Sequence, residues 1–302
     1  MSVVFAIAVA AGLAALLAAG MTWSPRVHAD VVDPEAEERW ILRRLRHHPR
    51  FADFVRRRLD PVKTGGLLLT TIFGIVLLAT IVIGLLLTMV RGNHGLAAWD
   101  QSVAQWGSDH ATDTSTRLLE LITQLGSTAV CLVALTATGV IDYVRHRNAN
   151  VILFLATVGG GVLLLNNVVK WLVERERPEV DPLTGFAGSS FPSGHTASAA
   201  ACWAAIALVL GRHHSRRTRS VLAGVAAAIA ILVAASRALL GVHWFTDVLA
   251  GLALGWGWFT VVAILFGGRI QRLGEPVERA AAGTEQSVRG EQVDRVESRK
   301  RS

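Results

Sequence analysis

The stretch GLLLTTIFGIVLLATIVIGLLLTMV, residues 66–90, runs for 25 positions without a charged side chain. A helix needs about 20 mostly apolar residues to cross the hydrocarbon core of a bilayer. Backbone groups in that core must be satisfied within the segment, and the stretch has none of the period-two alternation of a barrel strand. Residues 66–90 therefore predict a membrane-spanning helix.

Six further charge-free runs surround this stretch, at 3–19, 121–141, 151–169, 196–211, 220–236 and 248–268. Charged residues make up 18% of the chain, against roughly 25% in an ordinary soluble protein. We expect an all-α, polytopic membrane helical bundle with a six-helix core and one extra N-terminal transmembrane helix. A soluble two-domain protein is excluded.

The basic residues predict how the chain crosses the membrane. Of the 30 Lys and Arg residues, 24 fall in 20–65, 142–150, 212–219 and after 268, which share one side if every run spans. The alternate connections hold five, namely Arg91, Arg117, Arg175, Arg177 and Arg237. By the positive-inside rule, the basic side is cytoplasmic. The formal charge of +7 therefore sets orientation in the plasma membrane and does not indicate a nucleic-acid partner.

The chain divides into four expected segments: an N-terminal transmembrane helix at 1–22, a basic cytoplasmic juxtamembrane segment at 23–65, the core at 66–268 and a disordered cytoplasmic tail at 269–302. The first run could instead be a cleaved signal peptide, because VHA at 27–29 resembles a cleavage site. We favour an uncleaved helix, since the run lacks a positively charged start. The juxtamembrane segment fits either an interfacial helix or a solvated linker.

Three motifs gather polar residues at the expected outer ends of the last four spans. In the first, KWLVERERP at 170–178, Lys170 and Arg177 are seven positions apart and so share a helix face. Pro178 then ends or kinks the helix. The alternative is that Lys170 snorkels at a helix end and that the arginines are interfacial anchors.

The second motif, FPSGH at 191–195, immediately precedes an apolar helix. Ser193 and Gly194 leave the first N–H groups of that helix open to an anion, which the helix dipole favours. Alternatively, Ser193 is only an N-cap and His195 only a polar residue at the membrane boundary.

The third motif is SRALLGVHWFTD at 236–247. His243 and Asp247 are four positions apart and would be adjacent on one helix face. An aspartate there can accept the imidazole N–H and stabilise the imidazolium, although the pair could also be a purely structural hydrogen bond. A charge near the start of a membrane helix is costly, which favours a functional role.

Cations, imidazoles and a helix start on one side of the membrane suit phosphoryl transfer. The patterns K-x6-R-P, P-S-G-H and S-R-x5-H-x3-D, in this order, resemble the three-part signature of the type 2 phosphatidic acid phosphatase superfamily, with no departure at a motif position. The resemblance covers roughly residues 66–268 and implies a six-helix phosphatase core.

The resemblance also implies a role for each motif residue. His243 would be the nucleophile and form a phosphohistidine, Asp247 would orient it, and His195 would protonate the leaving group. The residues implied to bind the phosphoryl group are Lys170, Arg177, Ser193, Gly194, Ser236 and Arg237.

Because the superfamily is metal-independent, the resemblance implies neither a metal nor a cofactor. The outer side also lacks a carboxylate cluster suited to magnesium. Asp100, Asp109 and Asp113 are spread along the outer connection and are expected to be solvated. Cys131 and Cys202 lie in apolar runs and are expected to be packing residues.

We therefore expect a phosphatase acting on a lipid phosphate or diphosphate at the extracytoplasmic face, with a substrate of the undecaprenyl diphosphate, phosphatidylglycerol phosphate or phosphatidic acid class. A lipid phosphotransferase would use the same site. A non-catalytic transporter is the alternative from another class, because Asn166, Asn167 and Lys170 could line a pathway. Vanadium-dependent haloperoxidases resemble the same superfamily, but they are soluble.

Overall fold

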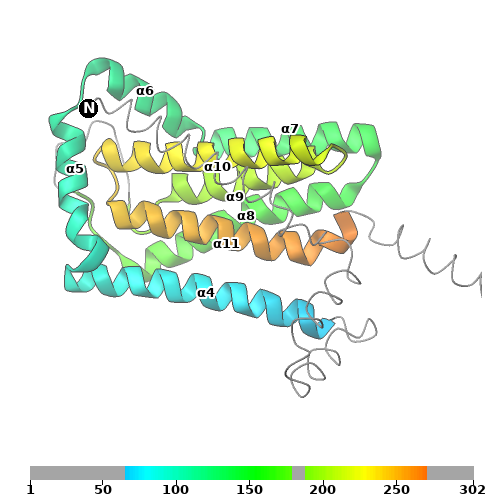
Figure 1. The fold of residues 1–302 in the computed structure, drawn as a ribbon, viewed down its shortest axis with the longest axis horizontal. Helices are drawn as coiled ribbons and strands as arrows, with labels where there is room; N and C mark the ends of the chain where they lie inside the picture. The colour runs from blue at the N-terminus through cyan, green and yellow to red at the C-terminus, as the bar shows by residue number, and fades with distance from the viewer. Residues whose placement is uncertain (1–64, 179–187, 271–302) are drawn as a thin grey trace, which may run out of the picture.

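The computed structural model describes residues 65–178 and 188–270 of the chain. In these parts every regular element is a helix, as Figure 1 shows: α4 (Gly65–Gly92), η2 (Gly95–Trp99), α5 (Asp100–Asp109), α6 (Asp113–Gln124), α7 (Thr128–His146), α8 (Ala149–Val173), α9 (Gly194–Gly211), α10 (Arg216–Leu239) and α11 (Phe245–Ile270). The expected N-terminal helix at 1–22, nearly all of the basic segment at 23–65 and the tail beyond 270 lie outside the described residues.

Six of these helices, α4 and α7 to α11, are long and apolar enough to cross a membrane. They run side by side along the bundle in Figure 1, while α5 and α6 lie at one end of it. The expected all-α, polytopic bundle with a six-helix core is confirmed.

Helix α9 is the centre of the bundle. It packs against α7, α8, α10 and α11, and 61% of its residues are buried, against 6% in the spanning part of α4. Two glycines of α11 allow its backbone to lie close to that of α9. A Cβ at Gly251 would lie 2.7 Å from the Ser193 carbonyl oxygen, and one at Gly255 would lie 2.4 Å from that of Ala197. Small residues four positions apart bring membrane helices into backbone contact, which places the starts of α9 and α11 together.

The charge-free run at 121–141 divides between two helices. Helix α6 ends at Gln124, and α7 begins after Ser127, whose side chain accepts a hydrogen bond from the Val130 N–H. The intervening turn includes Gly126, where a Cβ would lie 2.5 Å from the His195 carbonyl oxygen. Hydropathy does not mark this boundary, because the turn residues are uncharged and the helix break depends on capping.

The connection between α4 and α7 is folded against the bundle. Helices α5 and α6 both contact α10, and α5 also contacts α11. At Gly107 of α5, a Cβ would lie 2.5 Å from the Leu239 carbonyl oxygen of α10. The expectation that Asp100 is solvated is wrong: it is 4% exposed, at the start of α5. Its charge can be buried because Arg175 neutralises it and Thr246 donates hydrogen bonds to it.

Candidate active site

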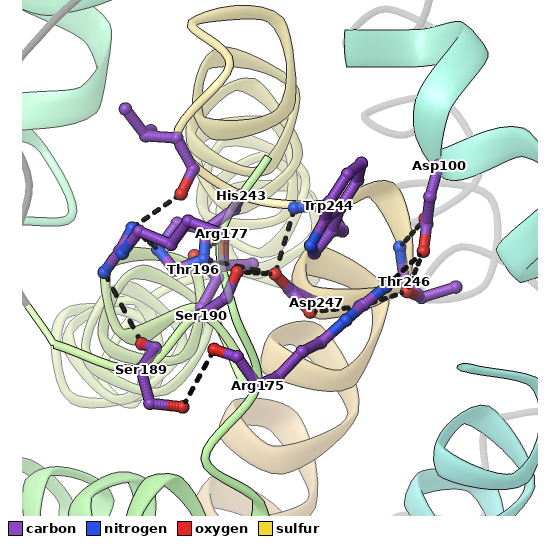
Figure 2. Close-up of polar contacts among 12 residues, drawn as sticks. Asp100, Arg175, Arg177, Ser189, Ser190, Thr196, His243, Trp244, Thr246 and Asp247 are labelled. Carbon is purple, nitrogen blue, oxygen red and sulfur yellow. Dashed lines mark hydrogen bonds and ion pairs between the residues drawn. The ribbon is translucent and has the colours of Figure 1, made fainter. Parts of the chain in front are cut away.

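The three motifs meet at one end of the bundle. The first starts in the last turn of α8 and continues past its end, the second begins α9, and the third joins the last turn of α10 to the first turn of α11. Figure 2 shows the polar contacts that link them. The site is therefore built from helix ends, where backbone groups outside the helical ladder are available for binding.

The first motif leaves the helix earlier than its spacing predicts. Helix α8 ends at Val173, and Glu174 adopts a left-handed conformation with φ of 47°. Arg177 therefore does not share a helix face with Lys170, and that expectation is wrong. The extended chain brings it back toward the same place: Lys170 Nζ donates to the Ser189 carbonyl oxygen at 2.6 Å, and Arg177 Nη2 donates to the same oxygen at 3.5 Å.

The second motif starts α9 as expected. Ser193 occupies the N-cap position, but its Oγ accepts a hydrogen bond from Thr196 Oγ1 at 2.9 Å and does not cap a backbone N–H. Gly194 lies against the buried Asn166, whose Nδ2 would be 3.0 Å from a Cβ at this position. His195 is half-buried in the first turn of α9.

The third motif contributes a buried cation. Arg237 is 6% exposed in the last turn of α10. Its Nη1 donates to Thr123 Oγ1 at 3.4 Å, and its Nε has no hydrogen-bond partner among the described residues. The Ser236 hydroxyl donates to the Val233 carbonyl oxygen at 2.8 Å, so it is engaged with its own helix. Buried guanidinium N–H groups are costly to leave unpaired, which makes Arg237 suited to an anion.

His243 and Asp247 approach each other without sharing a helix. His243 lies in the turn before α11, and its Nδ1 is 3.5 Å from Asp247 Oδ2. The other ring nitrogen, Nε2, is 3.5 Å from Arg177 Nη1. The carboxylate therefore faces one side of the imidazole and a cation faces the other.

Burial controls the charge of His243. The pKa of its imidazole is lowered from 6.5 to about 4, mainly by desolvation and also by the nearby Arg237 and Arg177 charges, while Asp247 opposes the shift. The ring is therefore uncharged at neutral pH. An uncharged imidazole has the free lone pair that a nucleophile requires.

Asp247 is held from several directions. Arg175 Nη1 donates to Asp247 Oδ1 at 2.6 Å, the Trp244 backbone N–H donates to Oδ2 at 2.9 Å, and the Ser190 hydroxyl donates to the same oxygen. Figure 2 shows the carboxylate at the centre of these contacts. Asp247 is fully buried, so these donors fix the position of its charge next to His243.

Arg175 and Asp100 were missed as site residues from the sequence. Arg175 Nη2 donates to Asp100 Oδ2 at 2.7 Å, and Asp100 also accepts from the Thr246 N–H at 2.9 Å and the Thr246 hydroxyl at 2.7 Å. Arg175 thus joins α5 to the start of α11 (Figure 2). Arg175 lies inside the first motif, but nothing local indicates its partner, which is 75 positions away.

The assembled end of the bundle is strongly cationic. Lys170, Arg177 and Arg237 place positive charges near the ring of His195, and the ring of His243 lies among the same groups. Three cations and two imidazoles around one point can hold the oxygens of a phosphoryl group and exchange a proton with it. No group of three or more His, Cys, Asp or Glu side chains in the described part of the chain is arranged to hold a metal ion.

Known proteins are similar to this chain in sequence and in architecture. The family model described as the PAP2 superfamily matches residues 149–271. Phosphatidylglycerophosphatase B of Bacillus subtilis (strain 168) is 37% identical over 139 residues, which cover 44% of this chain and 66% of that protein. Lipid A 1-phosphatase of Rhizobium etli is 35% identical over 123 residues, which cover 37% of this chain and 48% of that protein. This chain thus spans about half to two thirds of these relatives.

A solved structure matches a larger part of the chain. It is the crystal structure of a transmembrane PAP2-type phosphatidylglycerolphosphate phosphatase from Bacillus subtilis, with a TM-score of 0.55 and 31% identity. The match covers 64% of this chain and 98% of that one. With this match and the three motifs assembled at one end of six apolar helices, the chain belongs to the PAP2 superfamily and is a multi-pass membrane protein.

Proposed function

We propose that this protein is a lipid phosphatase that hydrolyses a phosphate or diphosphate group from a membrane lipid through a phosphohistidine at His243. The observation that carries the proposal is the meeting of an uncharged, buried His243 with Lys170, Arg177 and Arg237 beside His195. The cations would hold the non-bridging oxygens, whose charge grows in the transition state.

In the first step His243 Nε2 attacks phosphorus, and the bond from phosphorus to the lipid oxygen breaks. His195 must carry a proton at this step, which the negative charge of the bound phosphate favours. It gives that proton to the leaving oxygen, so the lipid leaves as an alcohol or as a lipid monophosphate. Asp247 stabilises the charge that develops on His243. Uncharged His195 then takes a proton from water, the resulting hydroxide attacks phosphorus, and the N–P bond breaks to release inorganic phosphate.

A lipid substrate is supported by a cavity below the site. About 350 Å³ of space lies between α7, α8 and α9, with mostly apolar walls. Ser198 and Cys202 line it, and they follow His195 by three and seven positions, so all three share one face of α9. A lipid tail held there would place its phosphate at the helix ends. The names of the relatives, a phosphatidylglycerophosphatase and a lipid A 1-phosphatase, also favour a phosphorylated lipid.

We also propose that the site faces the outside of the plasma membrane. The opposite end of the bundle carries the basic residues of the connections after α7 and α9, among them Arg145, Arg147 and Arg212. The positive-inside rule assigns that end to the cytoplasm. Cysteine accessibility at an exposed residue such as Glu176, measured in intact cells, tests the orientation. Labelling only after permeabilisation would place the site on the cytoplasmic side and contradict the proposal.

The activity test uses the purified protein in detergent with EDTA. Phosphate release is measured from phosphatidylglycerol phosphate, phosphatidic acid and undecaprenyl diphosphate, with and without an added lipid alcohol acceptor. We expect release from at least one lipid and a loss of more than about 1,000-fold in His243→Gln, because the nucleophile is removed. Arg217→Gln, an exposed arginine at the far end, is the matched control.

The intermediate is tested directly in His195→Gln, in which the second step lacks its base. Radiolabelled substrate should leave an acid-labile, alkali-stable label on this variant and none on His243→Gln. Full activity in His243→Gln would overturn the mechanism. Transfer of the phosphate to the added acceptor in preference to water would reassign the protein as a phosphotransferase.

A further inference from the structure

A second cavity lies at the end of the bundle opposite the candidate active site. It has a volume of about 280 Å³ and is enclosed by α9, α10 and α11. Five alanines of α9 and α10 line it, together with Leu208 and Gly211 of α9 and Trp256 and Phe259 of α11. Two arginines, Arg212 and Arg219, complete the lining. The catalytic proposal uses none of these residues.

Arg212 is buried with unused hydrogen-bonding capacity. Its side chain is 5% exposed, and its Nη2 donates to Asp142 Oδ1 at 2.5 Å. Its Nε and Nη1 have no hydrogen-bond partner among the described residues. Buried polar groups in native proteins are almost always paired, and a buried charged N–H without a partner is expensive. Two buried N–H groups of Arg212 are therefore available to an anionic acceptor.

Arg219 lies across the mouth of the same cavity. Its Nε donates to the His214 carbonyl oxygen at 3.1 Å, and its Cγ would be 3.3 Å from a Cβ at Gly211. The stem thus covers the end of α9 while the exposed guanidinium remains at the surface, the usual arrangement for an arginine at a membrane boundary.

The charge around the mouth is unbalanced. Residues 141–150 and 211–220 contain a single acidic residue, Asp142, and six arginines. Asp142 already binds Arg212 and lies 3.2 Å from His146 Nδ1. The excess of arginines over this single carboxylate therefore favours the entry of a second negative charge, despite the like charge of Asp142.

We propose that this cavity binds an anionic phospholipid of the leaflet opposite the candidate active site. The phosphate would accept hydrogen bonds from Arg212 and Arg219, and an acyl chain would lie in the alanine-walled groove against Trp256 and Phe259. Basic pockets between membrane helices on the cytoplasmic side bind anionic headgroups in this way. The apolar walls favour a lipid over a free anion. The inference depends on membrane insertion and does not depend on catalytic activity.

The test measures lipid binding to the full-length, delipidated protein by native mass spectrometry with titrated phosphatidylglycerol or phosphatidylcholine. We expect the wild type to prefer phosphatidylglycerol, and Arg219→Gln to weaken its binding by about tenfold through loss of a charged hydrogen bond. Arg217→Gln is the matched control, since Arg217 is exposed on the same helix and does not line the cavity. Lipid bound at the active site is common to these variants and cancels in the comparison.

Two further variants separate the headgroup from the tail. Asp142→Asn combined with Arg212→Gln removes the buried pair without leaving one charge alone, and should weaken phosphatidylglycerol binding by at least about tenfold. Ala227→Phe fills the groove and should have a similar effect, whereas Val225→Phe places the same side chain at an exposed position outside it. Elution as one species and an unchanged melting temperature show that each variant is folded.

Three outcomes would overturn the proposal. Equal binding of phosphatidylcholine and phosphatidylglycerol would show that charge does not contribute to binding. Unchanged binding in all the cavity variants would show that the lipid does not bind in this cavity. Inorganic phosphate that raises the melting temperature as much as phosphatidylglycerol, in an Arg219-dependent way, would make this a free-anion site.

Discussion

Two buried arginine–aspartate pairs lie at opposite ends of this bundle and differ in how completely they are satisfied. Arg175 bonds two carboxylates, Asp100 and Asp247, each of which has further donors. Arg212 makes one bond to Asp142, and its Nε and Nη1, like Asp142 Oδ2, have no partner among the described residues. Arg212 is nevertheless the more buried, at 5% exposed against 15% for Arg175.

The difference separates two uses of a buried charge. The desolvation of an ion costs several kcal/mol and is offset only when its hydrogen-bonding groups are filled. The Arg175 network is complete and fixes the carboxylate beside His243, so it is a scaffold. The Arg212 pair is incomplete within the described chain, as expected of a site that receives a ligand.

The largest effect should come from breaking the complete pair. Arg175→Gln leaves Asp100 and Asp247 buried without their shared cation, which should cost about 3–5 kcal/mol of unfolding free energy. Phosphate release per folded molecule should fall at least about 100-fold, because Asp247 is no longer held beside His243. Thermal unfolding and activity are measured together.

The control for Arg175→Gln is the double variant with Asp100→Asn. It should recover part of the stability, since one uncompensated charge is removed, but not the activity. Wild-type activity in Arg175→Gln would show that Asp247 is positioned without it.

A steric change at the active-site end should have the next largest effect. A Cβ at Gly126 would lie 2.5 Å from the His195 carbonyl oxygen, so Gly126→Ala must move the turn or the start of α9. We expect a loss of about 1–3 kcal/mol and reduced kcat, measured by melting and phosphate release. Gly74→Ala in α4 is the matched control, because nothing lies within 4 Å of its Cβ, and it should be neutral or slightly stabilising. Equal effects at the two glycines would contradict this reading of the contacts.

Breaking the incomplete pair should cost less. Arg212→Gln removes one charged hydrogen bond and leaves only Asp142 uncompensated, so we expect a loss of about 1–3 kcal/mol in lipid-free detergent. Adding Asp142→Asn should restore most of that loss. A cost equal to that of Arg175→Gln would mean that the two pairs are equivalent.

The smallest expected effect concerns the protonation of His243, which should not change across the neutral pH range. Because burial lowers the pKa of His243 to about 4, its ring should stay uncharged from pH 8 down to about pH 5, where an ordinary histidine has already taken up a proton. Side-chain 15N chemical shifts measure this, with His243→Gln identifying the signal. A midpoint near 6.5 would contradict the assigned burial.

The lowered pKa of His243 also predicts how the free energy of unfolding changes with pH. The unfolded chain binds the proton before the folded one, so the contribution of His243 to stability is fully present above pH 6.5. It falls as the pH drops toward 4.

Sequence alone determined the class of this protein. A charge-free run of about 20 residues is a local property, and it is sufficient for a helix to cross the hydrocarbon core of a bilayer. The six spans therefore follow from the composition of these runs. The motifs from Lys170 to Asp247 likewise pointed to the family in advance. Helix ends were less predictable: spacing placed Arg177 and His243 on helices, whereas capping at Glu174 and the turn before α11 put both outside.

Only the tertiary structure decided how the buried charges are paired. Arg175 and Asp100 are 75 positions apart, and Arg212 and Asp142 are 70 apart. From the sequence, Asp100 is predicted to be a solvated loop residue. It is buried because α5 packs against the ends of α10 and α11. A charge enters the interior only when a partner from another helix compensates its desolvation, and which helices meet is decided by packing contacts such as those of Gly107 and Gly251.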